Sequence, residues 1–150
     1  MPPGKCDNEN FNPSQFIGDY GDHPKIEIPG NLQIHHTRDI AKLARCIADK
    51  EQEYVMIVSL DLGMHVLNAR IVSIGGRETT TFSPGPVFRG AIIDRASEII
   101  MVHNHPGRDL DPTKADRKVL KMMIKAGKLL DINVIDSIIV HGKHYRSMVK

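Results

Sequence analysis

The chain has 150 residues, of which 41% are hydrophobic and 25% are charged, and its net charge at pH 7 is only +2. This length and composition are typical of one globular domain with a sizeable core, and they exclude a disordered chain. No apolar stretch approaches the roughly 18 residues that a transmembrane helix needs, and the N-terminus lacks a signal-peptide segment, so we expect a cytoplasmic protein. Cys6 and Cys46 are too isolated to predict a disulfide framework or a cysteine zinc site.

Charge is unevenly distributed along the chain. Residues 112–150 carry nine Lys or Arg against three Asp or Glu, whereas residues 1–111 carry eleven against fifteen. A basic C-terminal third can bind nucleic acid or another acidic partner. A solvated helix face is the simpler interpretation of the same charges, and both interpretations stay open.

The N-terminal segment differs in composition from the rest. Residues 1–30 hold five prolines and many Gly, Asn and Asp, which predicts a flexible N-terminal arm followed by a single domain over residues 31–150. A helix is expected next, with Thr37 as its N-cap and apolar residues at helical spacing through Ala48.

Two strands and a second helix are predicted in the middle of the chain. The β-rich run 54–60 and the run 64–74 are separated by the turn sequence Asp61-Leu62-Gly63, and they predict an antiparallel pair. Residues 79–83 are expected to form a loop. Pro86 stands where a helix can begin.

The remaining elements follow in the order strand, helix, strands. The continuous apolar run 98–102 is typical of a central strand that is covered on both faces. A helix should begin at Thr113 and weaken or end at Gly127, with Val119, Leu120, Met123 and Ile124 on its inner face and basic residues on its outer face. Closing strands are predicted over 133–135, 137–141 and 144–148. This order predicts an α/β protein whose mixed sheet is sandwiched by helices.

Two histidines stand where the predicted central strand ends. Side chains two residues apart in extended chain point to the same side, so His103 and His105 can converge on one metal ion. A third ligand must come from another element. Asp116 is the best candidate, because it lies one turn into the following helix with ten residues between it and His105.

Each of these residues also has an explanation that needs no metal. Thr113 and Asp116 match a capping box, in which the threonine caps the helix and the acidic residue reaches back to it. Pro106-Gly107 can be a simple turn. The other histidine pairs, His35-His36 and His141/His144, are interpreted as surface residues.

Together with Glu53, this histidine and aspartate spacing resembles the motif of JAMM (MPN+/JAB) zinc metalloproteases, most closely their RadC-like branch. The segments that carry the resemblance are 53–61, 99–106, 112–116 and 126–140. It covers roughly residues 32–148, and it implies the mixed-sheet MPN/JAB fold, whose architecture is similar to that of cytidine deaminases.

The resemblance implies a role for each matching position. His103, His105 and Asp116 would bind Zn²⁺, and Glu53 would act as the general base. The family's serine, which steadies the oxyanion, falls on Thr113, so a hydroxyl is kept. The implied substrate is a protein or peptide, with ubiquitin-like proteins among the candidates.

Departures from the family pattern leave the substrate open. Pro106-Gly107-Arg108 stands where RadC-like members have Pro-Ser-Gly. Longer members carry a helix-hairpin-helix-like region that residues 1–30 do not resemble, so a short form with the catalytic domain alone is expected.

The alternative function is a non-enzymatic DNA repair or recombination accessory that binds nucleic acid through its basic C-terminal third. An unpaired strand edge within 133–148 would also allow a homo-oligomer.

Overall fold

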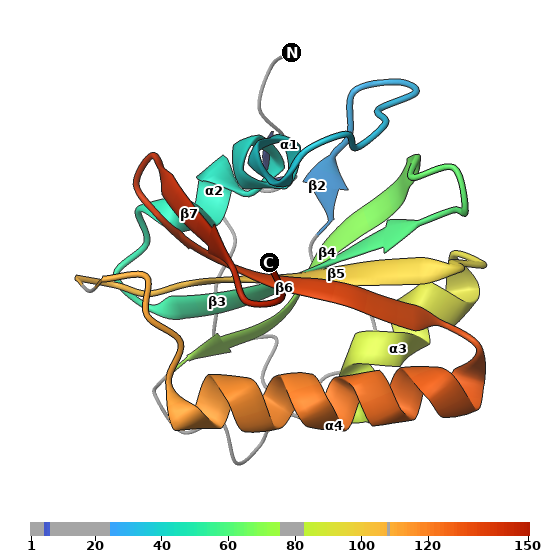
Figure 1. Cartoon of the computed structure of the whole chain (residues 1–150). Coiled ribbons are helices and arrows are strands. Elements are labelled where there is room, and N and C mark those ends of the chain that lie inside the picture. Colours follow the sequence, from blue (N-terminus) through green and yellow to red (C-terminus); the bar gives the residue numbers. More distant parts are fainter. Residues whose placement is uncertain (1–4, 7–24, 76–82, 108) are drawn as a thin grey trace.

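The computed structural model describes residues 5–6, 25–75, 83–107 and 109–150. In this part of the chain a five-stranded sheet, ordered β4-β3-β5-β6-β7, has helices on both faces, and a separate pair is formed by β1 and β2 (Figure 1). The elements are β1 (Lys5–Cys6), β2 (Ile26–Glu27), α1 (Thr37–Leu43), α2 (Arg45–Ala48), β3 (Glu53–Leu60), β4 (Val66–Gly75), α3 (Pro84–Ile93), β5 (Glu98–Asn104), α4 (Lys114–Leu130), β6 (Asn133–His141) and β7 (His144–Ser147). The predicted class, an α/β mixed sheet sandwiched by helices, is confirmed.

The sheet combines antiparallel and parallel pairs. β3 pairs antiparallel with both β4 and β5, whereas β5 and β6 are parallel and are connected through α4. In such a βαβ unit the carboxyl end of the first strand lies beside the start of the helix. The fold therefore brings the carboxyl end of β5 and the first turn of α4 together at one end of the central strands.

Two apolar cores lie on opposite faces of the sheet because successive strand residues point to opposite sides. Met56 and Val102 face α1 and α2, whereas Ile57 and Met101 face α3 and α4. The odd-numbered residues of β5 thus face α3 and α4, and His103 continues that series. Both cores consist of residues without side-chain charge. The polar groups at the end of β5 are therefore an exception among the buried side chains.

The first predicted helix differs from its prediction at both its start and its middle. His36 is the N-cap, and Thr37 is already helical. The cap lies one residue earlier than predicted because the Asp39 carboxylate accepts the backbone N–H groups of His35 and His36, at 2.9 and 3.0 Å. The helix is also interrupted at Ala44, which separates α1 from α2.

The sequence predicts that Gly127 weakens or ends the long helix, and the second alternative is wrong because the helix does not end there. α4 continues to Leu130 and ends where Asp131 takes a left-handed conformation with φ 58°. A Cβ atom at position 127 would lie 2.2 Å from the backbone oxygen of Ile132. The glycine therefore gives the returning chain room to pass close to the helix.

Other boundaries shift by smaller amounts. α3 begins at Pro84, before the predicted Pro86, and most of the predicted loop 79–83 lies outside the described residues. The two strands predicted over 133–135 and 137–141 form the single strand β6, whose pairing with β5 shifts register between Ile99 and Ile100.

Most of the predicted N-terminal arm lies outside the described residues, so its flexibility and its boundary near residue 30 stay predictions. Of its described part, Lys5–Cys6 pair with Ile26–Glu27. Ile26 is only 2% exposed and packs in the core beneath α1. Among the described helices none combines the length and the apolar character that crossing a bilayer requires.

Candidate metal centre

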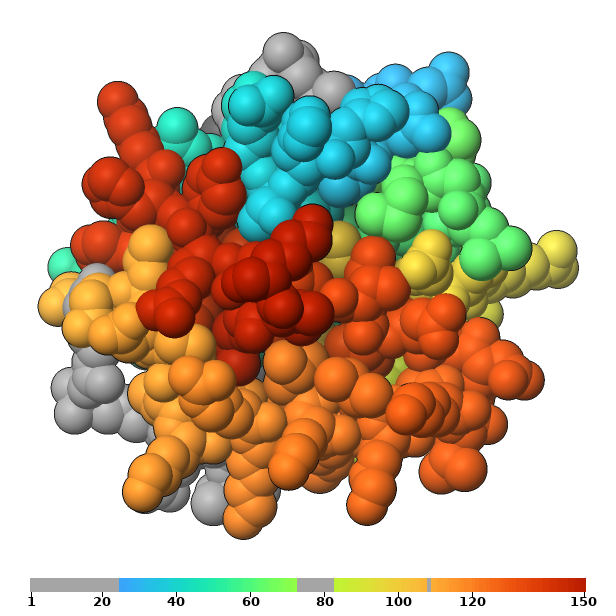
Figure 2. Space-filling view, in the orientation of Figure 1, coloured from blue at the N-terminus to red at the C-terminus, as the bar shows by residue number. Residues whose placement is uncertain are grey.

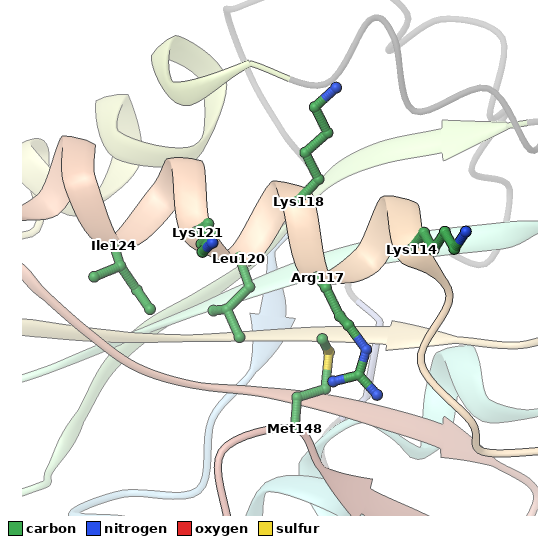
Figure 3. A pocket seen from close by; sticks show the side chains of 7 residues that line it. All are labelled: Lys114, Arg117, Lys118, Leu120, Lys121, Ile124 and Met148. Atoms are coloured by element: carbon green, nitrogen blue, oxygen red, sulfur yellow. The ribbon is translucent and has the colours of Figure 1, made fainter.

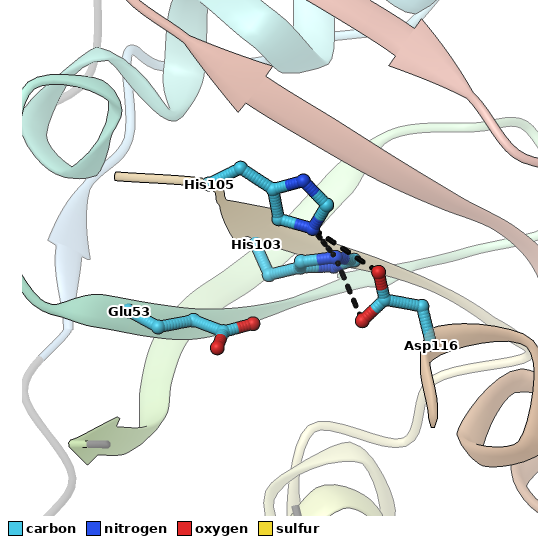
Figure 4. Close-up of side chains that lie close together, drawn as sticks. All are labelled: Glu53, His103, His105 and Asp116. Carbon is cyan, nitrogen blue, oxygen red and sulfur yellow. Dashed lines mark hydrogen bonds and ion pairs between the residues drawn. The ribbon is translucent and has the colours of Figure 1, made fainter. Parts of the chain in front are cut away.

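Four polar side chains converge where β5 ends and α4 begins. They belong to Glu53, His103, His105 and Asp116 (Figure 4). One nitrogen or oxygen atom from each side chain lies within 4.8 Å of those of the other three. Within the described ranges, this is the one group of three or more His, Cys, Asp or Glu side chains that is close enough to hold a metal ion.

The strand period brings the two histidines together, as their spacing predicts. Their side chains are each 7% exposed, and the two Nε2 atoms face one another at 3.2 Å. The Nδ1–H of His105 donates to the backbone oxygen of Asp109 at 3.2 Å. Once the ring is neutral, that bond leaves the His105 Nε2 lone pair directed at the cluster, which is the arrangement that a metal-binding imidazole needs.

Asp116 faces both histidines from the first turn of α4. Its Oδ1 lies 3.4 Å from Nε2 of His103, and its Oδ2 lies 3.1 Å from Nε2 of His105. The carboxylate is 8% exposed. A helix that starts at Lys114 therefore places its acidic N3 residue directly over the histidine pair.

The capping box predicted for Thr113 and Asp116 is also present. The Thr113 backbone N–H donates to Oδ2 of Asp116 at 2.9 Å, and the Asp116 N–H donates to Oγ1 of Thr113 at 3.0 Å. The Asp116 carboxylate can cap the helix and face the histidines at the same time, so these two roles do not exclude one another. Thr113 itself is exposed, and it is not one of the four clustered side chains.

The histidines and the aspartate perturb one another's protonation. Burial by itself would raise the pKa of the Asp116 carboxyl, but hydrogen bonds from His103 and His105 hold that pKa well below its ordinary value. The hydrogen bond with Asp116 raises the pKa of His105 despite burial. The aspartate is thus ionised over the physiological range, and His105 must release a proton to coordinate a cation.

Glu53 reaches the cluster from the neighbouring strand. Val55 pairs with His103 across β3 and β5, and Glu53 lies two residues before Val55, so it points to the same face of the sheet. Figure 4 shows its carboxylate directed toward the histidines. The side chain is half-buried at the first position of β3.

Asn104 is a polar residue of this region that the sequence did not single out. It is fully buried on the face opposite the histidines. Its Oδ1 accepts the Tyr54 backbone N–H at 2.6 Å, and its Nδ2 donates to the backbone oxygens of Lys50 and Gln52 at 3.2 and 2.9 Å. The amide thus holds the chain on both sides of Glu53. The sequence did contain a sign of this role. Asn104 stands between His103 and His105 at the end of a buried strand, and a buried amide must find hydrogen-bond partners.

The four side chains fit a divalent metal ion by their chemistry. Two imidazole nitrogens and carboxylate oxygens, buried and facing one another, are a donor set that zinc accepts with tetrahedral geometry. An open position for water is compatible with three protein ligands and a fourth, non-ligating carboxylate. The cluster can therefore hold a metal ion.

The mixed sheet and this histidine–carboxylate cluster define an α/β domain with a candidate metal site at the end of a central strand. Residues 34–150 match the family model of the RadC-like JAB domain. The chain belongs to this family, and the predicted resemblance to it is confirmed. Residues 34–150 include all four clustered side chains.

Relatives in bacteria and archaea support the same assignment. UPF0758 protein CT0611 from Chlorobaculum tepidum is 33% identical over 118 residues, which cover 78% of this chain and 53% of that protein. UPF0758 protein Mbar_A2303 from Methanosarcina barkeri is 34% identical over 100 residues, covering 67% and 44% respectively. A UPF0758 protein from Thermotoga maritima is 35% identical over 97 residues, covering 65% and 44%. The chain spans about half the length of these relatives, and their names state no activity.

Proposed function

We propose that the domain is a zinc-dependent metallopeptidase or isopeptidase of the JAMM type, which hydrolyses an amide bond in a protein or peptide. The observation that carries this proposal is the convergence of Glu53, His103, His105 and Asp116 within 4.8 Å of one another. Membership of the RadC-like JAB family supports it. A cytoplasmic location is part of the same proposal.

In this proposal His103, His105 and Asp116 hold Zn²⁺. Bound there, the ion would polarise the amide carbonyl and lower the pKa of a water toward about 7. The ionised Asp116 supplies one negative charge to the site. The Asp109 backbone oxygen keeps the His105 ring in the tautomer and the orientation that coordination needs.

Glu53 is proposed as the general base. Its carboxylate takes the proton from the attacking water and passes it to the nitrogen that leaves. Three neighbouring ligand groups make a fourth ligand unnecessary, so Glu53 is available for proton transfer. Asn104 holds the backbone on either side of this carboxylate and so limits where it can move.

Thr113 is proposed to stabilise the oxyanion. The Asp116 N–H already donates to Oγ1 of Thr113. The hydroxyl proton is still available, since a hydroxyl is a donor as well as an acceptor. Donation to the developing negative oxygen is the contribution expected of such a group.

A nucleic-acid-binding accessory is the second candidate function. α4 carries six Lys or Arg and one acidic residue, Asp116, whose carboxylate is engaged at the cluster. Measuring affinity for duplex DNA over a range of salt concentrations tests this alternative. A steep loss of affinity with salt would indicate phosphate contacts.

The hydrolytic proposal is tested with the zinc-loaded protein and a panel of ubiquitin-like fusions and peptide amides. Glu53→Gln keeps size and polarity but cannot take a proton, so it should retain metal and fold while losing about 10²-fold or more in rate. Glu51→Gln is the matched control, because Glu51 is exposed two residues earlier and should tolerate the change. Equal cleavage by Glu53→Gln and the wild type would contradict the proposed mechanism, and Glu51 would then be the nearest alternative base.

A further inference from the structure

A groove runs along α4 on the side that faces the C-terminal segment. Figure 2 shows α4 (orange) and that segment (dark red) side by side on one face of the molecule. The groove has a volume of about 540 Å³. Its lining comes from α4 and from one residue after β7, and consists of Lys114, Arg117, Lys118, Leu120, Lys121, Ile124 and Met148 (Figure 3).

The floor of the groove is aliphatic. Leu120 and Ile124 were predicted to face the core, but the buried residues of α4 are Met123 and Gly127. Leu120 and Ile124 are half-buried and line the groove, as does Met148. The prediction was wrong for these two residues, which line the groove together with Met148 and belong to neither apolar core.

The rim of the groove is cationic. Lys114, Arg117, Lys118 and Lys121 are all exposed. None of them takes part in an ion pair with another described residue. Like charges on neighbouring helical turns repel one another, so an anionic partner would relieve that repulsion.

We propose that this groove binds an acidic segment of a protein partner in which aliphatic side chains accompany the carboxylates. The carboxylates would pair with the four rim cations, and the aliphatic side chains would cover Leu120, Ile124 and Met148. A volume of about 540 Å³ is within the range of clefts that bind ligands, and the groove is open along its length, as an extended segment requires.

The lining favours a peptide over nucleic acid. A phosphate backbone would use the cations but would leave the aliphatic floor without a partner. None of the described residues that line the groove is aromatic, so these residues offer unstacked bases no stacking platform. The groove also begins at Lys114, beside Thr113 and two residues before Asp116, so a bound segment extends from the helical turn that carries the metal centre.

Fluorescence anisotropy with the full chain tests the proposal. The probe is a labelled peptide in which pairs of glutamates alternate with single leucines. A second peptide with serine in place of leucine keeps the charge and removes the aliphatic contacts. The first peptide should bind at least about tenfold more tightly than the second, and Lys121→Glu should weaken its binding by about tenfold or more, because like charges across an interface are costly.

Matched variants on the same helix give the control. Lys125→Glu makes the same charge change at a residue that does not line the groove, so it should weaken peptide binding clearly less than Lys121→Glu, because a charge that does not contact the peptide is partly screened. Leu120→Ser should weaken the glutamate–leucine peptide and leave the glutamate–serine peptide unchanged. Its melting temperature is measured alongside, so that loss of fold is not taken for loss of contact.

Two outcomes would overturn the proposal. One is absence of binding, or equal binding of the two peptides. The other is preferential binding of labelled DNA with equal losses in Lys121→Glu and Lys125→Glu, which would make α4 a phosphate-binding surface. Since cleavage is not measured, the result does not depend on whether the metal centre is hydrolytic.

Discussion

One oxygen atom of Asp116 takes part in two interactions. Oδ2 accepts the Thr113 backbone N–H and lies 3.1 Å from Nε2 of His105. Helix capping therefore orients the carboxylate before any cation binds. At the scale of single residues, the site depends on such shared contacts, and each can be tested by a substitution that removes one function and keeps the other.

Replacing Asp116 with Asn separates its two functions. Asparagine still caps a helix but is a poorer zinc ligand. Asp116→Asn should lose stoichiometric zinc, whereas the melting temperature of the metal-free protein at alkaline pH, where His105 is neutral, should hardly change. Metal analysis and thermal melts check this, with Asp39→Asn at the start of α1 as a capping control that keeps its metal. If Asp116→Asn retained zinc, Asp116 would be a helix cap and not a metal ligand.

The pH dependence of the metal-free protein follows from the same pair. The pKa of His105 is raised above 6.5, so its stabilisation is fully present below pH 6.5 and is lost as pH rises through the folded-state value. The pKa of Asp116 is lowered from 3.8, so its stabilisation is present above pH 3.8 and is lost only in stronger acid. Urea unfolding of the metal-free protein should therefore show falling stability above pH 6.5. His105→Ala should flatten this fall, and an unchanged slope in that variant would contradict the pairing.

Asn104 should matter for stability without being a metal ligand. Asn104→Ala removes the hydrogen bonds that the amide makes with the Tyr54 N–H and the Gln52 oxygen, and losing such bonds in a buried position costs about 1–3 kcal/mol. We expect a lower urea midpoint, retained zinc and slower hydrolysis, because the hold on Glu53 is lost. An unchanged midpoint would show that water replaces the amide at no cost.

At the scale of elements, α4 contributes to the candidate metal centre, to the core and to the groove. It begins with Asp116 at the cluster, packs Met123 into the core and presents Leu120 to the groove. Its C-terminal part depends on close approach of the backbone at Gly127. A sequence pattern reports helix propensity but not the path of the chain that returns beside the helix.

Gly127→Ala tests whether steric space or helix propensity determines the stability effect of a side chain at this position. Alanine is the better helix former by about 1 kcal/mol, yet its Cβ would lie 2.2 Å from the Ile132 backbone oxygen. We expect net destabilisation of about 1–3 kcal/mol in urea unfolding, as for other overpacked sites. Gly85→Ala in α3 is the control, because a Cβ there meets nothing within 4 Å. A stabilised Gly127→Ala would show that the returning chain moves aside easily.

Local patterns in the sequence predicted the strands of the five-stranded sheet, the approximate positions of the helices and part of the site, but not β1 and β2. His103, His105 and Asp116 follow from the strand period and from the position of a helix start. Glu53 has no local signal, since an acidic residue before a strand is usually solvated, and only the family resemblance identified it. Asn104 was missed because its partners lie about fifty residues away along the chain. Contacts of that range depend on strand pairing, which local patterns do not encode.

At the scale of the whole molecule, the candidate metal centre lies where three elements meet at one end of the central strands. β3 supplies Glu53, β5 and its end supply the histidines, and α4 supplies Asp116. The two apolar layers hold these elements in place independently of any cation. The metal-free protein should therefore remain folded, and metal binding should add stability in proportion to its affinity.

Metal analysis of the protein purified without added zinc tests the central claim most directly. One zinc per chain is predicted for the wild type, and His103→Ala and His105→Ala should each lose stoichiometric zinc while keeping their fold. Glu53→Gln should retain it, because Glu53 is proposed as a base and not a ligand. Full retention of metal by both histidine variants would contradict the metal centre described here.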